Sequence, residues 1–338
     1  MLFQSGTKVG YALGGGGARG LSHIGVLKVL NERGILPDII AGTSMGAVIG
    51  ALYAGGMEAG DIEHLIVQLD WRRLVLLADL TLPVRGLIQG RRVFSLLKSI
   101  LGDLTFPQLR CDFVCVATDI LTGEQVVLHD GSLIEAVWAS IAIPGIFTPV
   151  KIDGRYLVDG GLVNEVPVSV CRQRGAGWVV GVNVIPEPSK MVLGSRKGHS
   201  DYRGETSKAR ETGNKSKSPT VSSTHSPHLR LRFNNIEQEI KTFLMSHRPK
   251  EEHRMLRLLD SMPVNNSKRL PSRAPTLLDV LSQSLTIAEY RIAMENLKDV
   301  DLAISPDVAG IGFWQFDKAA EAITAGEVAV RQSLQQSK

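Results

Sequence analysis

One pentapeptide constrains the fold of this 338-residue chain more than any other stretch: Gly42-Thr43-Ser44-Met45-Gly46. An apolar run at residues 38–41 precedes it, and small apolar residues follow from Ala47 to Ala54. This order predicts a buried strand, a sharp turn and a buried helix. In a nucleophile elbow, glycines permit the turn, and the serine Oγ is exposed at the positive end of the helix. The alternative is a serine that only caps the helix in an ordinary glycine-rich turn.

A glycine-rich loop comes earlier in the chain, directly after an apolar run at residues 9–13. Its residues are Gly14, Gly15, Gly16, Gly17, Ala18, Arg19 and Gly20. Because glycines lack a Cβ, consecutive backbone N–H groups can turn toward one point, and the helix expected after the loop adds its N-terminal dipole. We therefore expect residues 15–20 to form an oxyanion hole. For Arg19, three predictions stay open: it adds positive charge there, faces solvent, or pairs with a carboxylate.

The same loop also has the spacing G-x-G-x-x-G from Gly15 to Gly20, which is typical of dinucleotide-binding proteins. That fingerprint needs an acidic residue at the end of the second strand. Here Asp38 lies at the beginning of that strand, and the elbow follows its end. Dinucleotide binding is therefore the less favoured interpretation, and we expect no cofactor.

The positions of the histidines indicate which residue would accept the serine proton. A serine–carboxylate–histidine triad of the α/β-hydrolase type runs in that order along the chain. All five histidines after Asp159 lie in a basic segment or at its edge. Asp159, in a glycine-rich turn at the end of an expected strand, is therefore the better candidate to contact Ser44 directly, although an ordinary turn aspartate is the alternative. Such a pair works only if partial burial raises the proton affinity of the carboxylate.

Apolar runs alternate with segments of helical period, which predicts an α/β fold with a mainly parallel central sheet covered by helices. The expected strands cover residues 9–13, 38–41, 112–118, 124–128, 151–152, 155–158, 178–185 and 302–304. The expected helices cover residues 21–30, 47–54, 61–69, 91–101, 132–140, 167–172, 276–297 and 317–334.

The basic residues are concentrated in one segment. The formal net charge is +4, but residues 189–275 alone hold 18 Lys and Arg against 8 Asp and Glu. Apolar residues become scarce from 189 to 228, so we expect a largely flexible insertion between a catalytic domain at 7–188 and closing elements at 276–335. A flexible basic chain is attracted to anionic lipid surfaces, and a solvated linker that binds nothing is the alternative.

Cysteine usage and hydropathy predict where the chain acts. Cys111, Cys115 and Cys171 are odd in number and lack metal or redox spacing, as expected for free thiols in a reducing compartment. We find no secretory leader pattern and no run near 18 uncharged apolar residues. The expectation is a cytoplasmic protein that contacts membranes only peripherally, without a metal or a nucleic-acid partner.

Four blocks of sequence together resemble the patatin-like phospholipase family. They are residues 15–20, the pentapeptide around Ser44, residues 139–144 with Ser140 and Pro144, and Asp159-Gly160-Gly161, in this order. The likeness is to bacterial members related to the neuropathy-target-esterase catalytic domain, and it covers about residues 9–185. It does not cover the 189–275 insertion.

This resemblance implies a patatin-like three-layer fold and a Ser–Asp dyad, with Ser44 as nucleophile and Asp159 as base. It also implies an oxyanion hole from residues 15–20 and metal-independent hydrolysis of acyl esters in phospholipids or lysophospholipids. The alternative function is a non-catalytic regulator that keeps the fold and binds lipid or membrane. Turnover of a chromogenic acyl ester separates the two.

Overall fold

The computed structural model describes residues 3–69, 90–190 and 277–336, so most of the expected insertion lies outside the described residues. The strands are β1 (Val9–Leu13), β2 (Ile39–Thr43), β3 (Asp112–Asp119), β4 (Gln125–Leu128), β5 (Val150–Ile152), β6 (Arg155–Asp159), β7 (Trp178–Val182) and β8 (Leu302–Ile304). The α-helices are α1 (Ser22–Glu32), α2 (Met45–Ala54), α3 (Ala59–Gln68), α5 (Arg91–Leu101), α6 (Leu133–Ser140), α7 (Val168–Gln173), α11 (Leu277–Asn296) and α12 (Ala319–Gln336).

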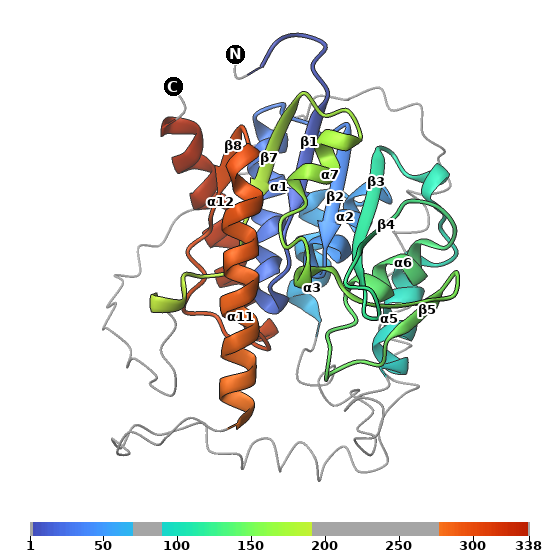
Figure 1. The fold of residues 1–338 in the computed structure, drawn as a ribbon. Helices are drawn as coiled ribbons and strands as arrows, with labels where there is room; N and C mark the ends of the chain where they lie inside the picture. The colour runs from blue at the N-terminus through green and yellow to red at the C-terminus, as the bar shows by residue number, and fades with distance from the viewer. Residues whose placement is uncertain (1–2, 70–89, 191–276, 337–338) are drawn as a thin grey trace, which may run out of the picture.

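The described strands form one sheet in the order β5-β6-β3-β2-β1-β7-β8, with β4 paired to β3 (Figure 1). Neighbouring strands are parallel from β3 through β2, β1 and β7 to β8, whereas β4 and β6 run antiparallel to β3. The predicted α/β fold with a mainly parallel sheet is therefore confirmed. The chain moves from β1 to β2 and β3 on one side and later places β7 and β8 on the other. Such a reversal is where open α/β sheets bind ligands, at the carboxyl ends of the strands.

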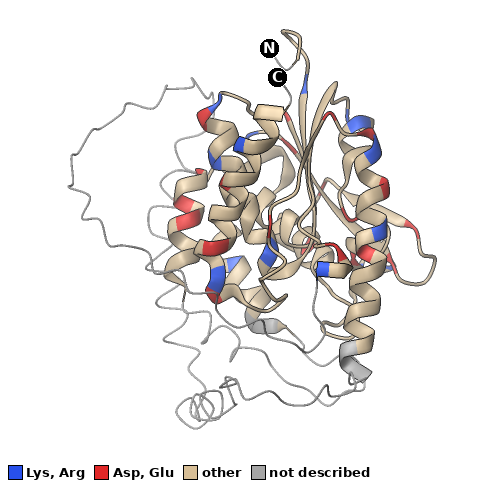
Figure 2. Cartoon of the chain, turned by 90° about the vertical axis from the view of Figure 1, so that its left-hand side faces the viewer, with Lys and Arg blue, Asp and Glu red and all other residues tan. Residues whose placement is uncertain are grey.

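The two faces of the sheet are covered by different helices. Along β1, Tyr11 and Leu13 pack into the larger core with α1, α2, α3 and α12, and Ala12 between them packs with α7 on the opposite face. Every residue of β1, β2 and β7 is buried, as expected for parallel strands covered on both sides. Figure 2 shows the sheet between the two helical layers, with most charged residues on the helices and loops.

The strand expected at residues 178–185 is shorter than predicted, because β7 ends at Val182. After Val182 the side chain of Asn183 forms a turn, because its Oδ1 accepts a hydrogen bond from the Ile185 N–H at 2.9 Å. An apolar run alone does not reveal this turn, because Val184 and Ile185 are buried whether or not they continue the strand. The turn leaves Val184 against the glycine loop.

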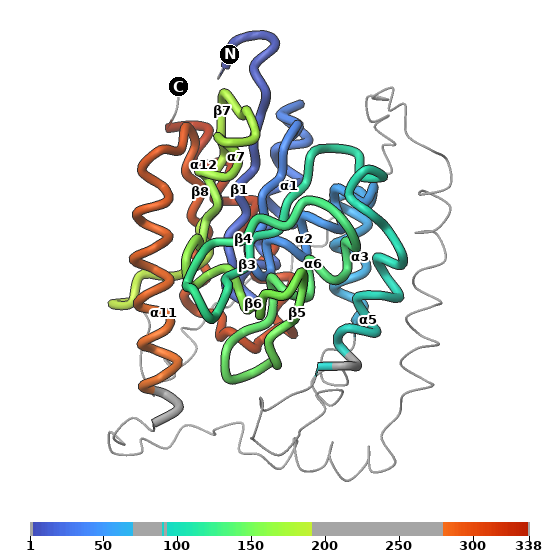
Figure 3. Tube along the Cα trace, turned by 45° about the vertical axis from the view of Figure 1, so that its right-hand side comes forward, coloured from blue at the N-terminus to red at the C-terminus, as the bar shows by residue number. Residues whose placement is uncertain are grey.

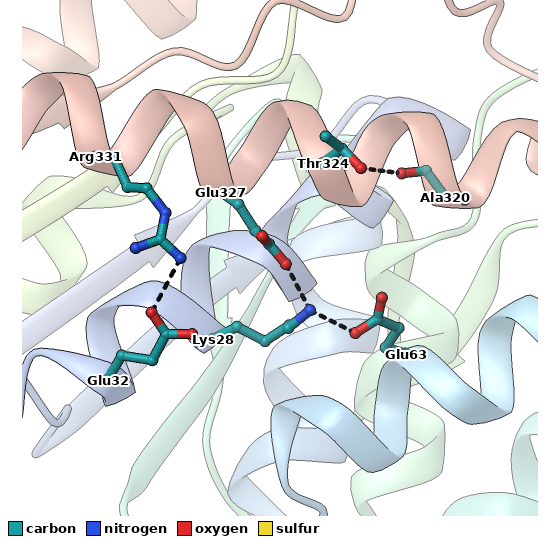
Figure 4. Close-up of polar contacts among 7 residues, drawn as sticks. All are labelled: Lys28, Glu32, Glu63, Ala320, Thr324, Glu327 and Arg331. Atoms are coloured by element: carbon teal, nitrogen blue, oxygen red, sulfur yellow. Dashed lines mark hydrogen bonds and ion pairs between the residues drawn. The ribbon is translucent and has the colours of Figure 1, made fainter. Parts of the chain in front are cut away.

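Helix α12 closes the larger core by crossing α1 at two glycines. A Cβ on Gly25 would collide with the carbonyl oxygen of Ile323, and a Cβ on Gly326 would collide with the carbonyl oxygen of Ser22. Ion pairs flank this crossing (Figure 4). The Lys28 ammonium group contacts Glu327 on α12 at 2.5 Å and Glu63 on α3 at 2.7 Å, and Arg331 contacts Glu32 at 3.0 Å. Close backbone packing and peripheral charge pairs together hold α12 on α1.

Helix α11 lies on the other face of the sheet, and Figure 3 shows it at the opposite side of the molecule from α5. Its last residue, Asn296, accepts a hydrogen bond from the Val166 N–H at 3.1 Å. Leu297 then packs against Gly181 in β7. From this anchor α11 extends past the carboxyl ends of the strands, and its first turns project beyond them (Figure 1).

Candidate active site

Ser44 stands on the sharp turn between β2 and α2. Its backbone has φ 53° and ψ −120°, a conformation that a residue with a side chain rarely adopts. The flanking glycines are needed for packing. A Cβ on Gly46 would collide with the Leu13 carbonyl oxygen, and one on Gly42 would lie 2.6 Å from the Ala47 nitrogen. Strain at a buried serine between a strand and a helix is the geometry of a nucleophile elbow.

The backbone of Ser44 is held by a residue from another part of the chain. The Ser44 N–H donates to the Oγ of Ser140 at 3.0 Å, and this hydroxyl donates to the Val116 carbonyl oxygen at 2.6 Å. Ser140 is the last residue of α6 and is fully buried. It therefore connects the strained turn to β3, a role that its sequence position did not reveal.

The register of the sheet brings Asp159 to Ser44. Thr43 lies opposite Val116 on β3, and Ala117 lies opposite Asp159 on β6. Because β3 stands between β2 and β6, Ser44 and Asp159 reach the same level of the sheet. Both side chains are buried, and the Ser44 hydroxyl is close enough to the Asp159 carboxyl group to lower its pKa.

The environment of Asp159 makes it a stronger base than an exposed aspartate. Burial raises the pKa of Asp159 to about 6, although the hydrogen bonds from Ser44 and from the Gly161 N–H lower it in part. The Gly161 N–H lies 2.9 Å from Oδ1, and the Thr118 hydroxyl holds the Asp159 carbonyl oxygen at 2.8 Å. The carboxylate is thus fixed in direction, and its proton affinity is matched to neutral solution.

The glycine loop after β1 contributes backbone N–H groups at the same end of the sheet. The Ala18 N–H donates to the Phe313 carbonyl oxygen at 2.9 Å, and Gly15 borders the carboxyl group of Glu165, whose pKa its N–H lowers. In the described part of the chain, the N–H groups of Gly16 and Gly17 have no acceptor. These two glycines have φ of 123° and 60°, and a Cβ on either would press on Val184 or Phe313.

Arg19 turns away from solvent, contrary to one of its three predicted roles, and none of the ion pairs found among the described residues joins it to a carboxylate. It is 4% exposed, and its Nε donates to the Ile311 carbonyl oxygen at 2.9 Å. Burial lowers the pKa of Arg19, while the nearby carboxyl groups of Glu289 and Glu165 counteract this. Sequence reasoning did not single out either glutamate. Glu165 carries no spacing signal in its loop, and Glu289 lies more than a hundred residues later.

Two of the histidines that the structure describes, His23 and His129, have partners other than the Ser44 hydroxyl. His23 is fully buried in α1 with its Nε2 2.8 Å from the Gly14 carbonyl oxygen, and burial lowers its pKa to about 4. It is therefore neutral at pH 7 and supports the glycine loop. His129 is exposed, with its Nδ1 3.2 Å from the Val127 carbonyl oxygen. Among the described residues no group of three His, Cys, Asp or Glu is arranged to hold a metal ion.

The fold and the site define an α/β protein with a strained serine elbow, a buried carboxylate partner and a glycine loop. Residues 11–172 match the family model described as patatin-like phospholipase, so the resemblance is confirmed over this part of the chain. The match includes the glycine loop, Ser44, Ser140 and Asp159. It ends before β7, α11 and α12.

Curated relatives agree with this assignment. The chain is 37% identical over 181 residues to the uncharacterized NTE family protein Rv1063c of Mycobacterium tuberculosis (strain ATCC 25618 / H37Rv), covering 54% of this chain and 50% of that protein. It is 36% identical over 187 residues to patatin-like phospholipase domain-containing protein 6 of Mus musculus, covering 53% and 14%. The chain thus spans half or less of the length of these relatives. The solved structure of VipD from Legionella pneumophila aligns over 98% of this chain and 88% of its own, with 15% identity and a TM-score of 0.43.

Proposed function

We propose that this chain hydrolyses acyl esters of lipids, with phospholipids or lysophospholipids as the substrate class. The observation that carries the proposal is that Ser44, on its strained turn, and Asp159 are both buried at the same level of the sheet, where the serine hydroxyl acts on the carboxyl group. The family of residues 11–172 and the printed name of the mouse relative, a patatin-like phospholipase domain-containing protein, supply the substrate class.

In the proposed mechanism Asp159 is the general base and Ser44 the nucleophile. The Ser44 hydroxyl gives its proton to the Asp159 carboxylate while Oγ attacks the ester carbonyl carbon, and the carbonyl π electrons move to the oxygen. The N–H groups of Gly16 and Gly17, for which the described residues offer no other acceptor, stabilise this oxyanion. The intermediate expels the alcohol, which takes the proton from Asp159, and leaves an acyl-enzyme.

Deacylation repeats the same proton movements with water. Asp159 removes a proton from the attacking water, and the second tetrahedral intermediate expels the Ser44 alkoxide as it regains that proton from Asp159. Charge at this level of the sheet changes little during the cycle, because the proton moves only between Asp159 and the reacting oxygens. The residues need no metal or organic cofactor for these steps.

We also propose the domain organisation expected from the sequence: residues 7–188 and 276–335 form one catalytic domain around the 189–275 insertion. Its excess of Lys and Arg would suit peripheral contact with anionic bilayers from the cytoplasm. No helix within 3–69, 90–190 or 277–336 has the length and apolarity that crossing a bilayer requires.

The test of the proposed function is turnover by purified protein of a soluble fatty-acyl ester and of a panel of phospholipids, lysophospholipids and neutral lipids. Ser44→Ala should abolish turnover, and Asp159→Asn should come close to doing so, with both proteins folded. A fluorophosphonate should add its mass to the wild type and leave Ser44→Ala unlabelled. Asp130→Asn, an exposed aspartate in a loop, is the matched control. Turnover that persists in Ser44→Ala would refute the proposal, as would a wild type that hydrolyses none of these esters.

A further inference from the structure

A second carboxyl group lies beside Asp159. Glu165, in the loop before α7, is 2% exposed. A Cβ on Gly161 would lie 2.5 Å from Glu165 Oε2 and 3.3 Å from Asp159 Oδ1, so the two carboxyl groups border the same glycine. The other side of the Glu165 carboxyl borders Gly15, where a Cβ would lie 2.8 Å from Oε1 and 3.0 Å from Oε2. Glu165 therefore bridges the start of the glycine loop and the turn that carries the base.

A third carboxyl group reaches this region from α11. Glu289 is half-buried; its charge acts on Glu165, and the charge of Asp159 acts on Glu289. Of the described cations, Arg19 is the one that acts on Glu165 and Glu289. Three carboxyl groups thus lie in a largely dehydrated region, and one guanidinium group acts on two of them. If Asp159 is ionised to serve as base, further negative charge on Glu165 and Glu289 lacks a counterion, which is costly in such surroundings.

The hydrogen bonding of Glu165 also favours its neutral form. The Gly15 N–H serves the carboxyl group, whereas Oε1 has no hydrogen-bond partner among the described residues. A buried anionic oxygen without a donor carries a large desolvation penalty, and a neutral carboxyl group carries much less. Burial raises the pKa of Glu165 well above its ordinary value, and the charges of Glu289 and Asp159 raise it further, against the smaller effects of Gly15 and Arg19. Burial raises the pKa of Glu289 to about 8.

We propose that Glu165 is a positioning residue which, in its neutral form, fixes the Gly15 end of the oxyanion loop beside Asp159, and that Glu289 and Arg19 control its charge. This rests on the proposed function for its effect on rate. The Gly16 and Gly17 N–H groups follow Gly15 directly, so the position of Gly15 sets theirs. Ionisation of Glu165 or Glu289 would place negative charge next to the developing oxyanion and oppose it. The enzyme is therefore active in the pH range in which Asp159 is ionised and the two glutamates are still neutral.

The test compares pH profiles of kcat/KM on a soluble acyl ester. The wild type should rise through a pH of about 6 and fall again above a pH of about 8, following Asp159 and then Glu289. Glu165→Gln keeps the shape and a neutral side chain, so both limbs should remain where Asp159 and Glu289 set them. Glu289→Gln should move the falling limb to higher pH, where Glu165 ionises. Glu165→Ala removes the acceptor of the Gly15 N–H and should lower kcat at least about tenfold at every pH.

A matched control and a second readout complete the experiment. Glu295→Gln changes an exposed glutamate on α11, the helix that carries Glu289, where Glu295 pairs with Lys298. The pH profile of this variant should overlay that of the wild type. Infrared spectra of Ser44→Ala at pH 7 should contain protonated carboxyl bands, and one of them, that of Glu165, should disappear when Glu165→Gln is added. This band does not depend on turnover, so it decides the inference even if the proposed function fails. A falling limb unchanged in Glu289→Gln, or the absence of a Glu165 band, would overturn the proposal.

Discussion

Ser140→Ala should damage both the stability and the rate of this protein, although Ser140 lies outside the proposed dyad. The substitution removes the 3.0 Å hydrogen bond from the Ser44 N–H and the 2.6 Å hydrogen bond to the Val116 carbonyl oxygen. Ser140 is fully buried, so water cannot replace its hydroxyl without rearrangement. An unsatisfied buried N–H costs about 1–3 kcal/mol, which is the expected loss in the free energy of unfolding.

The effect on rate follows from the backbone conformation of Ser44. The N–H that loses its acceptor belongs to the residue held at φ 53°, so the strained turn loses a contact that maintains it. Relaxation by about 1 Å displaces Oγ from Asp159 and is expected to lower kcat by about 10²-fold. KM should change much less, because Ser140 is buried beneath the elbow.

The assay combines urea denaturation with initial rates on a soluble acyl ester. Ser284→Ala on α11 is the matched control, because it removes an exposed hydroxyl that donates to the Val280 carbonyl oxygen at 2.8 Å. It should leave kcat unchanged. A Ser140→Ala enzyme with wild-type kcat would show that the elbow keeps its shape without this hydrogen bond. A loss of stability equal to that of Ser284→Ala would refute the estimate of its energy.

Three further outcomes follow from the structure. Gly16→Val should lower kcat by about 10²–10³-fold with little change in KM. A residue with a side chain rarely keeps φ 123°, so the backbone would rotate and turn the N–H of residue 16 away from the oxyanion. A rise in KM alone would contradict this. Asp159 must be ionised to accept a proton, so kcat/KM should fall about tenfold per pH unit below the Asp159 pKa of about 6. Asp159→Glu should shift the pH at which this fall begins. A fall that begins only at pH 4 would mean that the carboxylate is exposed. Gly326→Val should separate α12 from α1 and lower the free energy of unfolding, measured in urea, by at least about 1–3 kcal/mol. Gly60→Ala, with open space around its Cα, should not lower it. Equal urea midpoints for the two variants would refute the close helix crossing.

The fold could be predicted well where local patterns determine it. The helix expected at residues 91–101 begins and ends as predicted, because Gly90 and Gly102 both adopt positive φ at its ends. The strand after residue 178 was predicted too long, since the side chain of Asn183 forms the turn and hydropathy does not report side-chain direction. The insertion lies outside the described residues beyond Lys190, so its flexibility stays a prediction.

The site could be predicted only in part, for a related reason. Glycines two positions on either side of Ser44 predict a sharp turn because close backbone contacts exclude side chains, and this holds for any surrounding fold. Ser140 contacts Ser44 across 96 residues of sequence, and its hydroxyl can bond in many directions. Glu165 and Glu289 look like ordinary surface residues in sequence. Burial by the sheet, the glycine loop and α11 gives them their properties, and burial is a property of the assembled fold.

The late position of α11, β8 and α12 in the chain has a consequence for folding during synthesis on the ribosome. The chain emerges N-terminus first, so β1 to β7 and both residues of the proposed dyad are available well before residue 277. Until then β7 has an unpaired edge, the Gly25 face of α1 has no partner helix, and Glu289 is missing from beside Asp159. A nascent chain that already contains all four family blocks therefore has neither a closed core nor a finished site. Full hydrolytic competence would appear only after the last helices have left the exit tunnel.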